Sequence, residues 1–185
     1  MASGSTLPYE RNEELVALAI KGDGEAFGKL YLRHLDSIYR YVYFRVGDTA
    51  EAEDLTEEVF VRAWEALPRY QTREYQFISW LYRIAHNLVI DYRRRKRPDA
   101  LVNVDENPEA VTPHSPERIL EEVQSLENLS DAIRELNDDE QQVIVLRYIE
   151  GLSHDEVAAI IGKSNEASRV IQHRALARLH GLLKH

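Results

Sequence analysis

The stretch Phe77–Arg97, FISWLYRIAHNLVIDYRRRKR, decides most about how this chain folds. Its apolar residues recur every three or four positions, a spacing that predicts one long amphipathic helix. The residues expected to face the core are Ile78, Leu81, Ile84, Ala85 and Leu88. The helix runs without a break into five consecutive cationic side chains, Arg93 to Arg97, so its last turn should be strongly basic.

Two kinds of binding chemistry therefore share this helix. Trp80, Tyr82 and Tyr92 have flat faces on which unpaired bases can stack, and the basic end has charge for a phosphate backbone. Single-stranded nucleic acid requires that combination. Taken alone, the segment also fits a core helix with a solvated basic end, because aromatic stripes usually pack in cores and charge runs usually face water.

The composition narrows the class of protein. With 185 residues, 44% of them hydrophobic and 30% charged, and with only 8 glycines, the chain can bury one moderate core or two small ones and favours helices over sheets. Cysteine is absent, which excludes disulfides and thiolate metal sites. The apolar run Leu15–Ile20 is too short for a signal peptide or a membrane span. We expect a cytoplasmic protein with no membrane insertion, no cofactor, no metal and no small-molecule substrate.

The acidic charge is concentrated in the middle of the chain. The net charge is −9, yet residues 1–98 carry 15 basic and 15 acidic side chains, residues 99–136 carry 2 and 10, and residues 137–185 carry 6 and 7. Charges act over about 10 Å at physiological salt, so the local balance matters more than the total. The overall sign therefore does not exclude a nucleic-acid partner.

The middle of the chain also predicts a linker between two domains. Residues 98–116, PDALVNVDENPEAVTPHSP, contain four prolines, several acidic residues and no lysine or arginine, and lack a sustained apolar period. We therefore predict an all-α protein with a helical domain at 1–97, a flexible acidic linker at 98–118 and a second helical domain at 119–185.

In the first domain we expect a short helix, then a helix over Gly24–Val46 that is capped by Asp23 and stopped by Gly47. A third helix begins at Asp48, whose spacing to Glu51 resembles a capping box, and ends before Pro68. A polar loop follows, and its arginine and tyrosine side chains could hold a base that is extruded from the duplex. Its candidate residues are Arg69, Tyr70, Arg73 and Tyr75.

The second domain carries a helix-turn-helix pattern. After helices over about 119–136 and 138–151, Ser153 and Glu156 form a capping box for a short helix that ends at Gly162. Ser164 then caps a helix that runs to about Leu183 and exposes polar side chains able to meet base edges or phosphates. An ordinary helical hairpin is the alternative for this segment alone.

Three motifs in order resemble a known family. They are DLTEEVFVRAW at 54–64, WLYRIAHNLVIDYRR at 80–94, and LRY at 146–148 followed by GLS at 151–153 and EVA at 156–158. Together they resemble the extracytoplasmic-function, or group IV, sigma factors of bacterial RNA polymerase. In family terms, 1–97 resembles sigma region 2 and 119–185 resembles sigma region 4.

The resemblance implies a non-enzymatic protein that binds core RNA polymerase and promoter DNA and is controlled by an anti-sigma factor. The residues implied for docking on the polymerase are Asp54, Glu57, Glu58 and Arg62. Those implied for the melted −10 element are Arg69, Tyr70, Arg73, Tyr75, Trp80, Asn87, Asp91, Arg93, Arg94 and Arg95. Those implied for the −35 duplex are Ser164, Asn165, Glu166, Ser168, Arg169, Gln172, His173 and Arg174.

Several alternatives stay open at this stage. Asn87 could be a buried hydrogen-bonding residue, Trp80 could belong entirely to the core, and Glu166 could accept from a cytosine amino group or repel a phosphate. An enzyme is disfavoured, because no metalloprotease, phosphate-loop or nucleophile-elbow motif is present. A stand-alone helix-turn-helix regulator would leave the 54–64 and 77–97 segments without a role.

Overall fold

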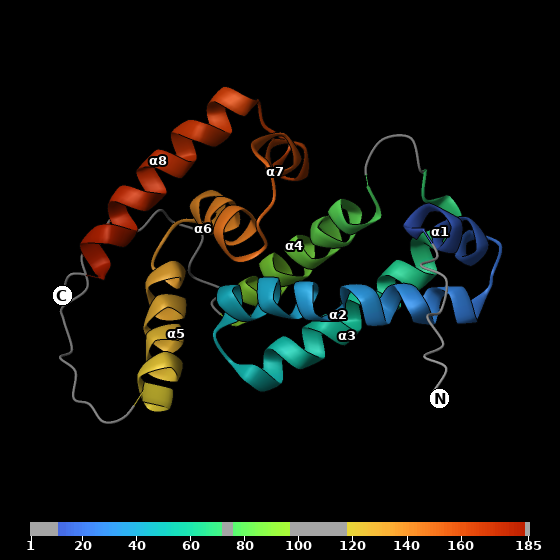
Figure 1. Ribbon diagram of the computed structural model, residues 1–185, viewed down its shortest axis with the longest axis horizontal. Helices are drawn as coiled ribbons and strands as arrows, with labels where there is room; N and C mark the ends of the chain where they lie inside the picture. Colours follow the sequence, from blue (N-terminus) through green and yellow to red (C-terminus); the bar gives the residue numbers. More distant parts are fainter. Residues whose placement is uncertain (1–10, 72–75, 97–117, 184–185) are drawn as a thin grey trace, which may run out of the picture.

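A computed structural model describes residues 11–71, 76–96 and 118–183, and over these ranges the chain is helical, without strands (Figure 1). The N-terminal half contains α1 (Asn12–Ile20), α2 (Gly24–Val46), α3 (Thr49–Ala66) and α4 (Phe77–Lys96). The C-terminal half contains α5 (Arg118–Arg134), α6 (Asp138–Ile144), α7 (His154–Ile161) and α8 (Asn165–Leu182). The predicted all-α class is confirmed, and most of the predicted linker lies outside the described residues.

The predicted caps on either side of α2 are present. The Asp23 carboxylate accepts from the backbone N–H groups of Glu25 and Ala26, at 2.9 and 3.0 Å. Gly47 ends α2 with φ at 76°, a conformation that favours glycine. Asp48 caps α3 as expected by accepting from the Glu51 N–H, whereas the Glu51 carboxylate pairs with Lys96 at 3.1 Å. The end of α4 is thereby tied to the start of α3.

Two helix boundaries differ from the sequence prediction. α3 ends at Ala66, and a 3-10 turn over Leu67–Arg69 follows that includes Pro68. The helix predicted to run from Asp138 to Gly151 is instead α6 followed by a π turn over Val145–Ile149. A π turn adds a residue to the helical repeat and is not visible in a 3.6-residue apolar pattern.

The helix-turn-helix is confirmed in its local geometry. Ser153 and Glu156 form the predicted reciprocal capping box, with the Ser153 N–H donating to the Glu156 carboxylate at 2.7 Å. Gly162 ends α7 with φ at 66°, and Ser164 caps α8 by accepting from the Ala167 N–H at 3.1 Å. These caps set the turn that presents α8.

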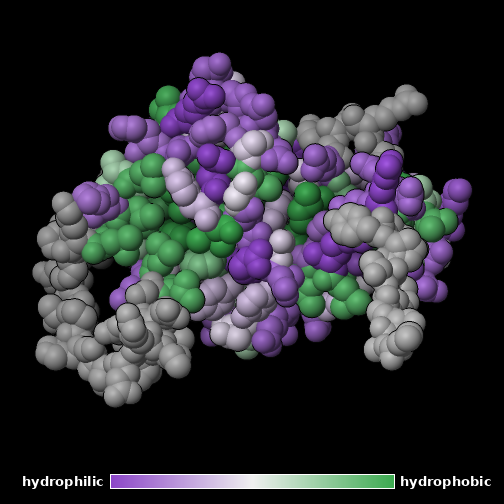
Figure 2. Space-filling view, in the orientation of Figure 1, coloured by the Kyte–Doolittle hydropathy of each residue, from purple (hydrophilic) through white to green (hydrophobic). Residues whose placement is uncertain are grey.

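One part of the surface is apolar. Figure 2 shows a contiguous hydrophobic area over α5, α6 and the C-terminal end of α8, whereas the surface over α7 and the start of α8 is mostly hydrophilic. The exposed large hydrophobic residues of α5, of the C-terminal half of α8 and of the residue after α8 are Leu126, Leu176 and Leu183. Contiguous apolar surface of this kind marks protein-binding sites in soluble proteins.

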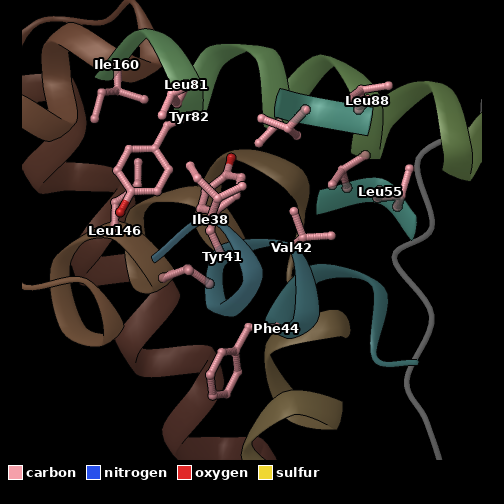
Figure 3. Packing of buried hydrophobic residues seen from close by; sticks show 14 of the residues in the cluster. Ile38, Tyr41, Val42, Phe44, Leu55, Leu81, Tyr82, Leu88, Leu146 and Ile160 are labelled. Atoms are coloured by element: carbon pink, nitrogen blue, oxygen red, sulfur yellow. The ribbon is translucent and has the colours of Figure 1, made fainter. Parts of the chain in front are cut away.

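The two halves share one hydrophobic core. Leu146 and Ile160 of the C-terminal half lie beside Ile38, Leu81 and Tyr82 of the N-terminal half (Figure 3). All five side chains are buried. Tyr82 is only 1% exposed, so it is wrong to expect its ring to be a stacking face for bases. The fold therefore closes the two predicted domains onto each other, with α2 and α4 packed against α5, α7 and the π turn.

Gly47 lies at this contact. A Cβ atom at Gly47 would collide with the guanidinium of Arg134 in α5. The Arg134 guanidinium is the end of a flexible side chain and can shift, so it is the positive φ that favours glycine here.

His34 gives the N-terminal half a pH-dependent stability. The side chain is buried in α2, its ring lies 5.7 Å from the Phe77 ring, and burial, with a smaller effect of Arg33, lowers its pKa from 6.5 to about 4. The folded state keeps His34 neutral while the unfolded chain takes up a proton below pH 6.5. The contribution of His34 to the free energy of unfolding is therefore present above pH 6.5. It falls by about 1.4 kcal/mol for each pH unit as the pH drops toward 4.

We expect His34→Leu to remove this dependence. The free energy of unfolding of the natural chain, relative to that of the variant, should fall by about 2 kcal/mol between pH 7 and pH 5. Urea unfolding of both proteins at the two pH values measures it. A parallel pH dependence in the two proteins would assign the acid sensitivity to other groups.

Candidate nucleic-acid interface

α3 presents an acidic stripe with apolar residues in it. Asp54 and Glu57 are exposed, and Glu58 is half-buried and pairs with Arg62 at 2.5 Å one turn later. Val61, at helical spacing from Asp54, Glu57 and Glu58, is more than half exposed. The four charged residues were predicted from the sequence but Val61 was not, because an apolar residue on a helix is expected to be buried. A mixed acidic and apolar stripe suits a protein partner with a basic groove.

α4 presents a second stripe along one side. Asn87 and Asp91 are exposed at a spacing of four residues, and Arg94 and Arg95 follow at the next turn, also exposed. Asn87 is therefore not a buried hydrogen-bonding residue. Amide, carboxylate and guanidinium groups in one row can contact both base edges and phosphates.

Aromatic rings continue this stripe toward the N-terminus of α4. Trp80 is half-buried, and its ring lies 4.8 Å from the Tyr70 ring and 5.7 Å from the Phe77 ring. Burial raises the pKa of Tyr70, which keeps its hydroxyl protonated. Arg69 is exposed in the turn before Tyr70. Arg73 and Tyr75 lie outside the described residues.

Arg93 departs from the predicted set. Its guanidinium turns away from Arg94 and Arg95 toward the C-terminal half, where it contacts Asp138 at 3.3 Å and donates to Gln141. Helical geometry explains the difference, because neighbours in a helix point about 100° apart and five consecutive basic residues cannot share one face. In this closed arrangement Arg93 is not a phosphate ligand.

The start of α8 presents a third surface. Glu166, Arg169, His173 and Arg174 are exposed at spacings that place them on one broad face. Val170, on the same face, is 56% exposed and was not predicted. An aliphatic side chain beside arginines can pack against a thymine methyl group in a major groove.

The other α8 candidates are held by protein contacts. Ser168 is fully buried, so it is wrong to expect it on the exposed face. Asn165 donates to Asp155 at 2.5 Å, and Gln172 donates to the Tyr148 hydroxyl at 2.7 Å. The Ser164 hydroxyl caps the helix. These bonds orient the start of α8 and leave the exposed side chains to meet a ligand.

Comparison with known proteins gives these three surfaces a context. Residues 30–98 match the model for Sigma-70 region 2, and residues 132–180 match that for Sigma-70 region 4. The ECF RNA polymerase sigma factor SigD of Mycobacterium tuberculosis is 33% identical over 179 residues, which cover 94% of this chain and 84% of SigD. The chain belongs to the ECF family of RNA polymerase sigma factors.

Two other known proteins match over most of the chain. BldN of Streptomyces coelicolor is 40% identical over 94% of this sigma factor, which spans 66% of the length of BldN. Among solved structures, CnrH in complex with the cytosolic domain of CnrY matches with a TM-score of 0.70 and 27% identity, over 94% of this chain and 97% of CnrH.

In this sigma factor a polar cluster joins the two halves beside the shared core. We call it the Arg45 cluster; it consists of Arg45 from α2, His86 and Arg93 from α4, and Asp138 from α6. The Arg45 guanidinium binds the Asp138 carboxylate and lies 3.0 Å from His86 Nδ1. The Arg93 guanidinium also donates to the Arg45 carbonyl, at 2.6 Å.

Buried neutral groups complete the surroundings of this cluster. Arg45 donates to the Tyr41 hydroxyl at 2.6 Å, and Gln142 of α6 donates to the same hydroxyl at 3.2 Å. Gln142 also contacts His86 Nδ1. Burial raises the pKa of Tyr41, so its hydroxyl stays protonated. Both halves thus supply hydrogen-bond partners to one buried site, as buried polar groups require.

A second polar contact joins the halves through Glu150. Its carboxylate binds Arg40 in two places, at 2.9 and 3.0 Å, and accepts from the Tyr82 hydroxyl at 3.1 Å. Tyr82 was not predicted as an interface residue, because the sequence of an amphipathic helix does not show which part of the chain its aromatic side chains will contact.

The described residues lack two other kinds of site. They contain no group of three or more histidine, aspartate or glutamate side chains arranged to hold a metal ion. In the same part of the chain, none of the helices is long and apolar enough to cross a membrane.

Proposed function

We propose that this sigma factor docks on core RNA polymerase through the acidic stripe of α3, contacts the melted −10 element with α4 and the preceding turn, and recognises the −35 duplex with α8. The observation that carries the proposal is the separation of the exposed polar side chains onto these three helices. The side chains of each helix suit its partner. Those of α3 are acidic and suit a basic protein groove, those of α4 are aromatic and basic and suit single-stranded DNA, and those of α8 are mixed polar and suit a major groove.

The sites follow from the exposed and half-buried members of each set. Docking rests on Asp54 and Glu57, with Glu58 and Arg62 as a neighbouring ion pair. The −10 contacts rest on Arg69, Tyr70, Trp80, Asn87, Asp91, Arg94 and Arg95. The −35 contacts rest on Glu166, Arg169, Val170, His173 and Arg174, with Ser164, Asn165 and Gln172 holding the helix start.

The proposal includes an anti-sigma factor and excludes catalysis. Two proteins with matching structures were solved with a bound protein: CnrH with the cytosolic domain of CnrY, and the sigma factor RpoE of Bartonella quintana with NepR, which is described as an anti-sigma factor. The apolar surface over α5, α6 and α8 offers such a partner a docking area (Figure 2). We place this sigma factor in the cytoplasm, where it acts as a non-enzymatic initiation factor.

Dependence on polymerase tests the proposal. A promoter duplex should bind tightly to the complex of the sigma factor with core enzyme and weakly to the sigma factor alone. Fluorescence anisotropy of a labelled duplex, titrated with each species, compares the two. Equal affinities would favour a stand-alone helix-turn-helix regulator.

The basic end of α4 gives a prediction about salt. Replacing both Arg94 and Arg95 by alanine should weaken promoter binding by the holoenzyme and reduce the slope of log affinity against log salt by about 1 for each lost phosphate contact. Titrations at several salt concentrations give the slope. Lys29→Ala, which removes a cation that pairs with Glu25 on α2, is the control and should leave the slope unchanged.

A further inference from the structure

Tyr148 is an aromatic residue that lies on the surface where a regular helix would bury it. In an α-helix its ring would share a face with Val145 and Ile144, three and four residues earlier, and both of these side chains are buried. The π turn over Val145–Ile149 adds a residue to the helical turn and so rotates the side chains that follow. Tyr148 is 50% exposed. Since single π turns are frequent at functional sites, this position is a candidate for a role in binding.

A hydrogen bond ties the Tyr148 ring to the first half of α8. Gln172 Nε2 donates to the Tyr148 hydroxyl at 2.7 Å. A tyrosine hydroxyl can both accept and donate, whereas an amide nitrogen can only donate. The bond therefore uses a lone pair of the hydroxyl oxygen and leaves the hydroxyl proton. Among the residues that the structure describes, no group accepts this proton, so it is available to an acceptor outside the chain.

The Tyr148 hydroxyl is held at the flank of α8. Gln172 lies one turn after Arg169 and directly before His173, and both of these side chains are exposed. Gln172 itself is half-buried, on the side of the helix that carries the fully buried Ser168. The hydroxyl bonded to Gln172 therefore lies between the buried side of α8 and the exposed face that we assign to the −35 duplex.

The dimensions of the major groove decide what a group at the flank of α8 can meet. The groove is about 12 Å wide, and a helix with its side chains is about 10 to 12 Å across, so a helix in the groove fills it. The face of the helix that points into the groove then meets the bases. A donor held at the flank from a neighbouring segment meets the wall of the groove, where the phosphates lie, and tyrosine hydroxyls are among the groups that donate to phosphate oxygens.

We propose that Tyr148 is a phosphate ligand of the −35 duplex. Its hydroxyl accepts from Gln172 and donates to a non-bridging phosphate oxygen at the edge of the groove that α8 enters. Because the same hydroxyl bonds α8, the contact fixes the position of that helix relative to the DNA backbone. The inference rests on the proposed −35 contacts of α8 and adds to them a ligand from outside α8, which the sequence did not predict.

A neutral donor differs from an arginine in its response to salt. Tyr148→Phe should weaken promoter binding by the holoenzyme about tenfold on every −35 sequence, because it removes one hydrogen bond to a charged group. The slope of log affinity against log salt should stay unchanged, because the substitution removes no cation and alters no counterion release. Arg174→Ala should weaken binding and also reduce the slope by about 1.

Substitution of single phosphates locates the contact. A methylphosphonate replaces one charged non-bridging oxygen by a methyl group, and duplexes that carry one, as separated stereoisomers, are made for each position across the −35 element. Holoenzyme affinity for each duplex is measured with the natural chain and with Tyr148→Phe. At one position the methylphosphonate should weaken the natural holoenzyme at least about fivefold more than the Tyr148→Phe holoenzyme, as expected in a double-mutant cycle for two groups in contact.

Tyr39→Phe is the matched control. It removes the same hydroxyl from a half-buried ring on α2, in the other half of the chain, and should show the natural pattern at every position. Circular dichroism and thermal unfolding check that both variants are folded. The proposal is overturned if the two variants show the same pattern. It is also overturned if Tyr148→Phe changes the base preference on a panel of single-base −35 variants, because the hydroxyl then orients α8 and does not bind phosphate.

Arg174→Ala separates this inference from the proposed function. Weak binding by the Arg174→Ala holoenzyme, together with normal binding by the Tyr148→Phe holoenzyme, would overturn the role of Tyr148 alone. Full affinity of both holoenzymes, with no phosphate position at which a methylphosphonate weakens binding, would overturn the proposed −35 contacts of α8 as well.

Discussion

Lysine at both Asp54 and Glu57 is expected to weaken binding of the sigma factor to core RNA polymerase by at least about 30-fold, or roughly 2 kcal/mol or more. Both carboxylates are exposed on α3. Reversal places like charges opposite a basic partner surface, which costs more than the loss of attraction alone.

Competition against a labelled sigma factor for core enzyme measures this loss. Lysine at both Glu13 and Glu14 of α1 makes the same charge change on another exposed helix and should leave the affinity within about twofold. Circular dichroism controls for helicity. If the α3 variant and the α1 variant bind core enzyme equally well, polymerase docking does not use the acidic stripe.

Arg169→Ala is expected to cost about 1 to 3 kcal/mol on the preferred −35 sequence and to flatten discrimination at one or two positions. Arg169 is exposed near the N-terminus of α8, the end that enters a major groove in helix-turn-helix proteins. Arg174, more than a turn later, should contact phosphate, so Arg174→Ala should weaken all sequences alike.

A panel of single-base variants of the −35 element, bound by holoenzymes that carry each substitution, separates the two effects. Val170→Ala extends the test to the aliphatic residue that the structure places on this face. It should lower affinity only where a thymine methyl group is present. An Arg169→Ala holoenzyme with an unchanged preference profile would mean that α8 lies in the groove in another register.

Local signals in the sequence predicted the helices well. Asp23, Ser153 and Ser164 cap helices where expected, and Gly47 and Gly162 end helices in the left-handed conformation that a glycine tolerates. These features depend on residues within one turn of each other, so spacing alone reveals them.

The features that the sequence did not predict are long-range. Arg93 and Tyr82 have the residue types of a nucleic-acid surface, yet both contact the C-terminal half, through Asp138 and Glu150. Ser168 is on the buried side of α8 because the helix packs through Ile171 and Ala175. No periodicity within a helix specifies which partner will cover it, so such assignments need the tertiary structure.

Run-off transcription is the most direct test of the central claim, that this chain directs RNA polymerase to promoters through three separate helical surfaces. Purified core enzyme, the sigma factor and genomic promoter fragments are combined, and the transcripts are mapped. We predict defined start sites that appear only with the sigma factor, disappear with lysine at Asp54 and Glu57, and are redistributed among promoters by Arg169→Ala. Transcripts that do not depend on the sigma factor, or that survive the α3 variant unchanged, would contradict the account.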